Sequence, residues 1–314
     1  MEQDYPPRYM EILVADGMSD DDTRKKILSL ARSDHHALVV ILDNPAKIVP
    51  TGMNIALRQA RGEIIIRVDG HCMIDRDYVS KCVEHIQMDG VDGVGGPMES
   101  LGTTRIAKII AIGMSSLFGV GNSVFRTVTG KSMLVDTVPF PAYTRQIIDR
   151  AGGYDEELVR NQDDEYNYRI RELGGKILLA IDVRSKYFSR TSLAGLWGQY
   201  FQYGFWKVRV LQKHPLQMSS RQFVPPVFVL ALLLSALLAL LPLSRPYASI
   251  VPFSYLIANL GAAFWIASRR RWASLPLLPI IFAILHLSYG LGFLVGMVKF
   301  SGRWNDKLGK VPTL

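Results

Sequence analysis

The segment EIIIRVDGH, residues 63–71, decides the fold class of this 314-residue chain. Its apolar run ends on Asp69, as a buried parallel strand does when it delivers a polar residue at its carboxyl end. Two similar apolar runs precede it, at residues 11–15 and 38–42, and the first ends on Asp16. The three runs predict three parallel strands whose ends carry acidic residues.

The segments between these runs have the periodicity and the stop signals of helices. They cover residues 19 to about 32, 52–60 and 77–88. A further strand region begins at Gly93. Alternating strands and helices predict a doubly wound α/β domain, in which ligands bind at the carboxyl ends of the strands. We therefore expect Asp16 and Asp69 to contribute to one site.

Hydrophobic residues make up 49% of the chain, and they are distributed unevenly. The chain is mixed and charged as far as about Ser220 and almost wholly apolar from there to Phe300. This break predicts a catalytic domain over residues 1–220 and a membrane domain over residues 221–314. The apolar part contains three candidate membrane spans, since a span takes about 20 residues. They cover residues 224–243, 247–267 and 275–298.

The formal net charge is +8, and many basic residues flank the apolar segments. Residues 186–221 and 269–271 are such flanks, and the positive-inside tendency places residues 207–221 and 269–271 in the cytoplasm. Three full spans would then put the basic residues between Lys299 and Lys310 outside, so the alternative is that one of the three is re-entrant or interfacial. No nucleic-acid motif accompanies the charge, and two cysteines without metal spacing suit a reducing cytosol.

The segment NQDDEYNYRI, residues 161–170, places three acids in a row. It lies between the glycine pairs at residues 152–153 and 174–175, so the acids fall in the first turn of a short helix. The helix dipole favours acids there. Adjacent carboxylates are costly to bury, and proteins keep them mainly where a base or a cation is held. An acidic helix start and a catalytic site are both compatible with this pattern.

Four motifs taken together resemble the family 2 inverting glycosyltransferases, in particular the succinoglycan and exopolysaccharide glucosyltransferase type. These motifs are VADGMSDDDT at residues 14–23, RVDGH at 67–71, VRNQDDE at 159–165 and QYFQYGFWK at 199–207. The resemblance covers nearly the whole chain. It implies a nucleotide-diphospho-sugar transferase domain of the GT-A type, followed by transmembrane helices.

The resemblance assigns donor-binding roles to residues at the strand ends. Asp16 matches the aspartate that recognises the uracil or ribose of the donor, although it could also only cap the next helix. Asp69 matches the first position of the D-x-D motif, which holds a divalent cation (Mn²⁺ or Mg²⁺) on the donor diphosphate. His71 replaces the second aspartate and could ligate the metal or hydrogen-bond a phosphate. Arg67 faces the core, the donor or solvent.

The same resemblance implies a general base in the acidic segment, because an inverting transfer needs a carboxylate to accept the acceptor's proton. Counting back from Arg169 places Asp163 in that position, with Asp164 as the alternative. Gln162 stands where the family has glutamate. Glu165 and Arg169 are four residues apart and should pair across a helical turn.

The last motif resembles the Q-x-x-R-W sequence, with Gln202 and Trp206 in the matching positions. Trp206 would stack on a sugar, or it would be an aromatic-belt residue at the lipid surface. Arg190, Lys207 and Arg209 would meet phosphates of a lipid-linked acceptor or anionic lipid headgroups.

The resemblance thus predicts an inverting, metal-dependent hexosyltransferase at the bacterial plasma membrane, with its catalytic domain in the cytoplasm. It would move glucose from a UDP-sugar donor to a polyprenyl-linked glycan in exopolysaccharide biosynthesis, and it would bind membrane lipid but no nucleic acid. Met1 lies just before the strand that is usually second in the family, so the first strand and its nucleotide-binding loop are expected to be missing. A catalytically inactive scaffold or partner subunit is the alternative.

Overall fold

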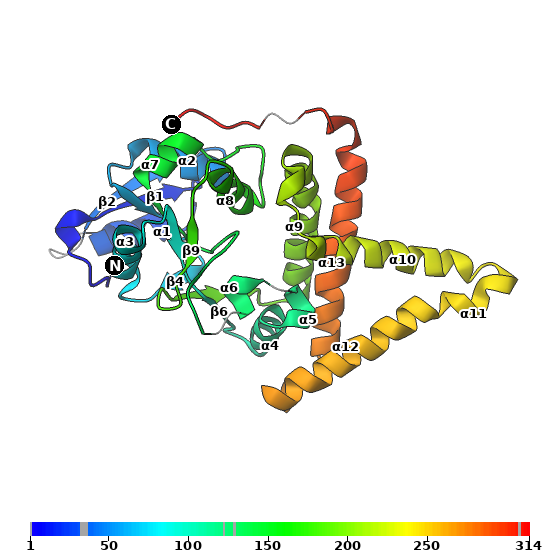
Figure 1. Cartoon of the computed structure of the whole chain (residues 1–314). Helices are drawn as coiled ribbons and strands as arrows, with labels where there is room; N and C mark the ends of the chain where they lie inside the picture. Colours follow the sequence, from blue (N-terminus) through cyan, green and yellow to red (C-terminus); the bar gives the residue numbers. More distant parts are fainter. Residues whose placement is uncertain (1, 32–36, 122, 128–129, 307–308) are drawn as a thin grey trace. The chain divides into compact units, whose positions relative to one another are not determined.

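The computed structural model describes residues 2–31, 37–121, 123–127, 130–306 and 309–314 (Figure 1). The chain divides into two compact units. The first comprises Met1–Met98, Val128–Lys186 and Leu308–Leu314, and the second comprises Glu99–Thr127 and Tyr187–Lys307. The predicted boundary near residue 220 falls inside the second unit and stays a prediction.

In the first unit, β1 (Glu11–Asp16) and β2 (Leu38–Asp43) pair in parallel, with Asp16 opposite Asp43. The helices α1 (Thr23–Ala31) and α2 (Val49–Gln59) follow these strands. These elements confirm the strand–helix alternation read from the sequence; Arg32, the expected end of the first helix, lies outside the described residues.

A second sheet of the first unit has five strands in the order β3-β8-β5-β9-β7. Its strands are β3 (Ile64–Ile66), β8 (Ala142–Thr144), β5 (Gly93–Gly95), β9 (Ile177–Leu179) and β7 (Met133–Leu134). Of the strand pairs described in this sheet, β5–β9 is parallel, whereas β3–β8, β5–β8 and β7–β9 are antiparallel. The α/β class is confirmed, and this sheet is mixed. Within the described residues β1 and β3 belong to different sheets, so strand pairing does not by itself bring Asp16 beside Asp69.

Helices pack on this mixed sheet through apolar side chains. α3 (Tyr78–Asp89) buries Tyr78, Cys82 and Ile86, and α7 (Arg145–Ala151) buries Ile147 and Ile148. The acidic segment forms α8 (Gln162–Glu172), with its three acids in the first turn as the sequence predicts. The first unit also contains η1 (Pro7–Tyr9) and β4 (Cys72–Ile74). Two of the boundaries between the units fall within β6 (Met98–Leu101) and β10 (Ser185–Phe188).

The second unit is helical. Its long helices are α4 (Arg105–Met114), α9 (Leu193–Lys213), α10 (Val224–Leu238), α12 (Ile250–Arg269) and α13 (Leu278–Lys299). The unit also contains short helical segments: α5 (Leu117–Val120), α6 (Val124–Thr127), η2 (Pro215–Gln217), η3 (Ser220–Gln222), η4 (Pro242–Ser244), α11 (Arg245–Ala248), η5 (Trp272–Ser274) and η6 (Ser301–Arg303).

Within this unit α9 and α13 run side by side, while α10 and α12 form two arms joined at α11 (Figure 1). Glycines permit the close packing of α9 and α13. A Cβ on Gly204 would lie 2.0 Å from the Tyr289 carbonyl oxygen, and one on Gly292 would lie 2.1 Å from that of Phe201. Three stretches, Ser220–Leu238, Pro242–Arg269 and Leu278–Lys299, are helical, long and apolar enough to cross a membrane.

Candidate active site

Arg67 and Asp69 lie where β3 ends, two residues apart. The Arg67 guanidinium donates to both carboxylate oxygens of Asp69, from Nε to Oδ1 at 2.8 Å and from Nη2 to Oδ2 at 3.2 Å. Arg67 is buried, at 7% exposure. Burial opposes its charge, but Asp69, Tyr154 and Asp163 raise the pKa of Arg67 above its ordinary value. Arg67 is therefore a buried cation of the site, not a surface residue.

The charge of Arg67 also acts on Asp163. It is half-buried in the first turn of α8. Burial raises the pKa of Asp163, the charge of Arg67 lowers it, and the charges of Asp164 and Asp69 raise it. The structure thus brings three of the predicted residues together, Arg67, Asp69 and Asp163, with Asp164 adjacent. A carboxyl of raised pKa beside a buried cation is typical of functional sites.

Tyr154 completes this cluster, although nothing in the sequence singled it out beyond a turn. Its ring stacks on Tyr166 of α8 at 4.1 Å between centroids, and the Arg67 guanidinium lies 6.0 Å from its centre. Burial raises the pKa of Tyr154 to about 12, against the opposing charge of Arg67. Asn54 of α2 fixes the backbone of Tyr154 by accepting from its N–H at 2.7 Å and donating to its carbonyl at 2.9 Å.

Glu165 and Arg169 form the predicted pair across one turn of α8, at 2.6 and 3.0 Å. Arg169 also donates to the carbonyl oxygens of Ala151 and Gly153, at 2.5 and 2.8 Å. The pair therefore ties α8 to the loop of residues 151–156, which carries Tyr154. Its role is to position the acidic helix.

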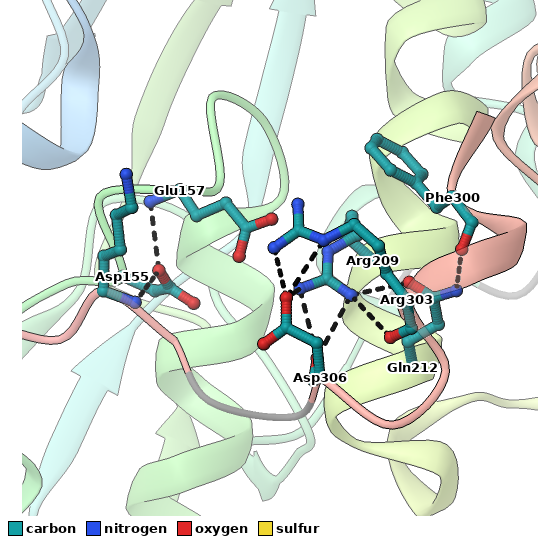
Figure 2. A network of polar contacts seen from close by, with 8 residues as sticks. Asp155, Glu157, Arg209, Gln212, Phe300, Arg303 and Asp306 are labelled. Carbon is teal, nitrogen blue, oxygen red and sulfur yellow. Dashed lines mark hydrogen bonds and ion pairs between the residues drawn. The ribbon is translucent and has the colours of Figure 1, made fainter.

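The C-terminal segment, residues 309–312, binds the same loop. The Asp155 carboxylate accepts from the backbone N–H groups of Lys310, at 2.8 Å, and Glu157, at 3.0 Å (Figure 2). The carbonyl oxygens of Lys310 and Pro312 accept from Glu156 and Gly153. Asp155 is 1% exposed. The sequence does not mark this contact, because 155 residues separate its partners.

Asp16, at the end of β1, is already hydrogen-bonded locally. It accepts from the Ser19 hydroxyl at 2.6 Å and from Arg24 Nε at 2.6 Å. These contacts hold the pKa of Asp16 at about 2. Among the described contacts, Asp16 binds the loop residue Ser19 and the Arg24 side chain but no backbone N–H of α1, so the capping role and the donor-binding role both stay predictions.

Gln202 and Trp206 lie in the second unit, on α9, where the Trp206 indole N–H donates to Gln202 Oε1 at 3.1 Å. Trp206 also contacts Phe300. The prediction that Arg209 meets lipid phosphates is wrong. Arg209 is fully buried and donates to Gln212 at 2.6 Å and to the Asp306 carbonyl oxygen at 3.3 Å (Figure 2). Lys207 is buried as well and donates to Gln217.

The predicted metal ligands form an incomplete set. Among the described residues, no three His, Cys, Asp or Glu side chains are grouped to hold a metal ion. Asp69 and the exposed His71 supply one carboxylate and one imidazole. Two ligands suit a cation that arrives with a diphosphate, because Mg²⁺ and Mn²⁺ in nucleotide sites take the remaining ligands from phosphates and water.

Two buried polar atoms of this region have no hydrogen-bond partner within the part of the chain that the structure describes: Arg67 Nη1 and Gln162 Oε1. Buried polar groups are normally paired, so each unpaired one requires an explanation. Both residues are connected with Asp163: the charge of Arg67 acts on it, and Gln162 precedes it in the sequence. A polar ligand at the cluster would account for both.

Comparison with known proteins identifies the family of this site. The model of "Glycosyl transferase family 2" matches residues 1–150. Succinoglycan biosynthesis protein ExoA of Rhizobium meliloti (strain 1021) is 30% identical over 307 residues, covering 95% of this chain and 88% of that protein. The chain belongs to glycosyltransferase family 2.

A second relative of this family 2 glycosyltransferase comes from Methanococcus voltae. It is dolichyl N-acetyl-α-D-glucosaminyl phosphate 3-β-D-2,3-diacetamido-2,3-dideoxy-β-D-glucuronosyltransferase, 24% identical over 303 residues, covering 95% of this chain and 90% of that protein. Among solved structures, mannosyltransferase PcManGT from Pyrobaculum calidifontis, in complex with GDP-Man and Mn²⁺, gives a TM-score of 0.59 at 16% identity. It covers 93% of this chain and 80% of that one. This likeness shows the GT-A-type fold.

Proposed function

We propose that this glycosyltransferase inverts the anomeric centre and moves glucose from a UDP-sugar to a polyprenyl-linked glycan. The observation that carries the proposal is Arg67, which pairs with Asp69 on one side and acts on Asp163 through its charge. One buried cation thus links the carboxylate assigned to the donor with the carboxylate assigned to the acceptor. The relative ExoA supports the exopolysaccharide setting through its name.

In the proposed reaction the acceptor hydroxyl attacks the anomeric carbon, the bond from that carbon to the diphosphate oxygen breaks, and Asp163 takes the hydroxyl proton. A raised pKa suits Asp163 to this role, because a base with a pKa nearer neutrality accepts a proton more effectively. A single displacement needs no second carboxylate as nucleophile. Asp164 is the alternative base.

A divalent cation is part of the proposal. Asp69 and His71 would hold it, and when bound it would neutralise charge on the departing diphosphate. Arg67 orients Asp69 through two hydrogen bonds, and its Nη1 remains available to a donor oxygen. We also propose that Asp16, Gln202 and Trp206 contact the donor.

We place the catalytic part, residues 1–220, on the cytoplasmic side of the bacterial plasma membrane. The membrane part, residues 221–314, would keep the enzyme beside its lipid-linked acceptor. Basic residues at 207–221 and 269–271 support this side of the membrane.

The base assignment is tested by Asp163→Asn and Asp164→Asn, with Glu172→Gln at the exposed end of α8 as the control. We expect Asp163→Asn to lower kcat by about 10²–10⁴-fold while UDP-glucose binding, measured by calorimetry, is retained. Normal turnover in Asp163→Asn would refute its role. If the folded wild type bound neither UDP- nor GDP-sugars with Mn²⁺ present, an inactive scaffold would replace the enzyme proposal.

A further inference from the structure

The number of membrane crossings follows from the contacts of the C-terminal segment. Residues 309–312 hydrogen-bond the loop of residues 153–157 through Lys310, Pro312 and Asp155, and both segments belong to the first unit. That unit carries Arg67, Asp69 and Asp163. The C-terminal segment and the active-site residues therefore lie on the same side of the membrane, whichever side that is.

The candidate spans α10, α12 and α13 all lie between the catalytic part and this terminal segment. A chain that leaves one side of a membrane and returns to it must cross an even number of times. Three crossings would put residues 309–314 on the side opposite to the loop they bind. Either one of the three helices or all three therefore stay on one side of the membrane.

Burial in protein distinguishes α13 from the other two candidate spans. In α13, 44% of the most apolar window is buried in protein, against 17% in each of the other two spans. Its glycine face packs on α9, a helix whose buried residues include Arg209 and Gln212. Gln212 donates to the carbonyl oxygen of Phe300, directly after α13, at 2.7 Å, and Arg209 contacts Asp306 (Figure 2). These polar partners bind the end of α13 to α9.

We propose that the chain crosses the membrane twice, through α10 and α12, and that α13 lies against α9 at the membrane surface on the catalytic side. Charge supports this topology independently. With two crossings, residues 269–271 and the basic residues from Lys299 to Lys310 all lie on the same side as residues 207–221, which removes the conflict with the positive-inside tendency.

The surface that results fits anionic lipid headgroups. The turn between α12 and α13 carries Arg271, which lines a small pocket together with Arg105 and Lys108 of α4. Trp265 and Trp272 lie beside this turn and are 59% and 55% exposed. Exposed tryptophans and basic side chains are typical of the membrane–water interface.

Cysteine labelling with a membrane-impermeant maleimide tests the proposal on the full chain. The background is Cys72→Ser, because the remaining Cys82 is fully buried. Single cysteines are placed at Leu243, at the α10–α11 tip, at Leu314, and at Lys25 as a marker of the catalytic unit. In spheroplasts we expect Leu243→Cys to react at once, and Leu314→Cys and Lys25→Cys to react only after permeabilisation.

Labelling of Leu314→Cys together with Leu243→Cys in sealed spheroplasts would overturn the proposal, as would protection of all three positions. If Leu314→Cys and Lys25→Cys were labelled while Leu243→Cys was protected, two crossings would stand and the cytoplasmic placement would fail. The test requires no turnover, so it is independent of the proposed reaction.

Discussion

Arg67 and Asp69 form a two-point ion pair, with Nε 2.8 Å from Oδ1 and Nη2 3.2 Å from Oδ2. Only one residue separates them, so this charged pair forms locally at the end of β3 and requires no residue from elsewhere in the chain. Asp163 then adds a second carboxylate to the field of the same guanidinium. In this site the charge of one buried cation, Arg67, thus acts on two carboxylates with different proposed roles.

Changes at Arg67 should separate its charge from its two-point geometry. Arg67→Gln removes the charge that lowers the Asp163 pKa, so that pKa rises and the acidic limb of the kcat–pH profile moves to higher pH. Arg67→Lys keeps the charge but cannot form both hydrogen bonds to Asp69. It should lower kcat/KM by about 10–100-fold without moving the acidic limb. Arg61→Gln is the control, because Arg61 is exposed and pairs with Glu11. If the acidic limb of the kcat–pH profile were the same in Arg67→Gln as in the wild type, the effect of Arg67 on the Asp163 pKa would be contradicted.

Replacing His71 with aspartate should change the metal preference. His71→Asp restores a D-x-D sequence, and carboxylates favour Mg²⁺ more than imidazole does. We expect the Mg²⁺ concentration for half-maximal activity to fall relative to that for Mn²⁺. Met73→Asp, which adds a carboxylate at an exposed position two residues further on, should change neither value. Equal effects of the two variants would indicate added surface charge as the cause.

Gly309 tests the contact between the C-terminal segment and the active-site loop. A Cβ there would lie 2.5 Å from Asp155 Oδ2, whereas a Cβ on Gly302 would meet nothing within 4 Å. Gly309→Ala should therefore loosen the segment, at a cost of about 1–3 kcal/mol in stability, and lower kcat by displacing the loop that carries Tyr154. Hydrogen exchange of residues 152–157 and turnover are the measurements. If Gly309→Ala behaved like Gly302→Ala, the contact would not support the loop.

The packing of α9 on α13 predicts opposite effects at two glycines. Gly292→Ala places a Cβ 2.1 Å from the Phe201 carbonyl oxygen and should destabilise the second unit by about 1–3 kcal/mol. Gly198 on α9 is exposed and has open space around it, so Gly198→Ala should stabilise by up to about 1 kcal/mol through helix propensity. Thermal unfolding in detergent compares the two. A neutral Gly292→Ala would show that the helices are further apart.

The lowered pKa of Asp16 predicts that the stability of the protein depends on pH in the acidic range. Its pKa is about 2 in the folded protein, against an ordinary value of 3.8, because Ser19 and Arg24 stabilise the carboxylate. A lowered folded pKa contributes stability above pH 4, and this contribution is lost as the pH falls towards 2. The unfolding temperatures of wild type and Asp16→Asn should therefore converge over that window. Asp20→Asn, at an exposed position in the same loop, is the control, and a constant Asp16→Asn difference down to pH 2 would exclude this linkage.

The sequence by itself determined the features that depend on neighbouring residues. The strand ends at Asp16 and Asp69, the acids in the first turn of α8 and the Glu165–Arg169 pair all follow from spacings of a few residues. Periodicity and turn chemistry act over such distances. The length and apolar composition of the three candidate spans could be predicted for the same reason.

Only the tertiary structure decided which distant groups meet. Arg67 acts on Asp163, Asn54 hydrogen-bonds Tyr154, and Lys310 hydrogen-bonds Asp155, and the partners in each case are about a hundred or more positions apart in the sequence. Arg209 contacts Gln212 and Asp306 and not the predicted lipid phosphates. A buried guanidinium needs hydrogen-bond acceptors, and the fold determines which ones lie beside it. Local spacing carries no information about such partners.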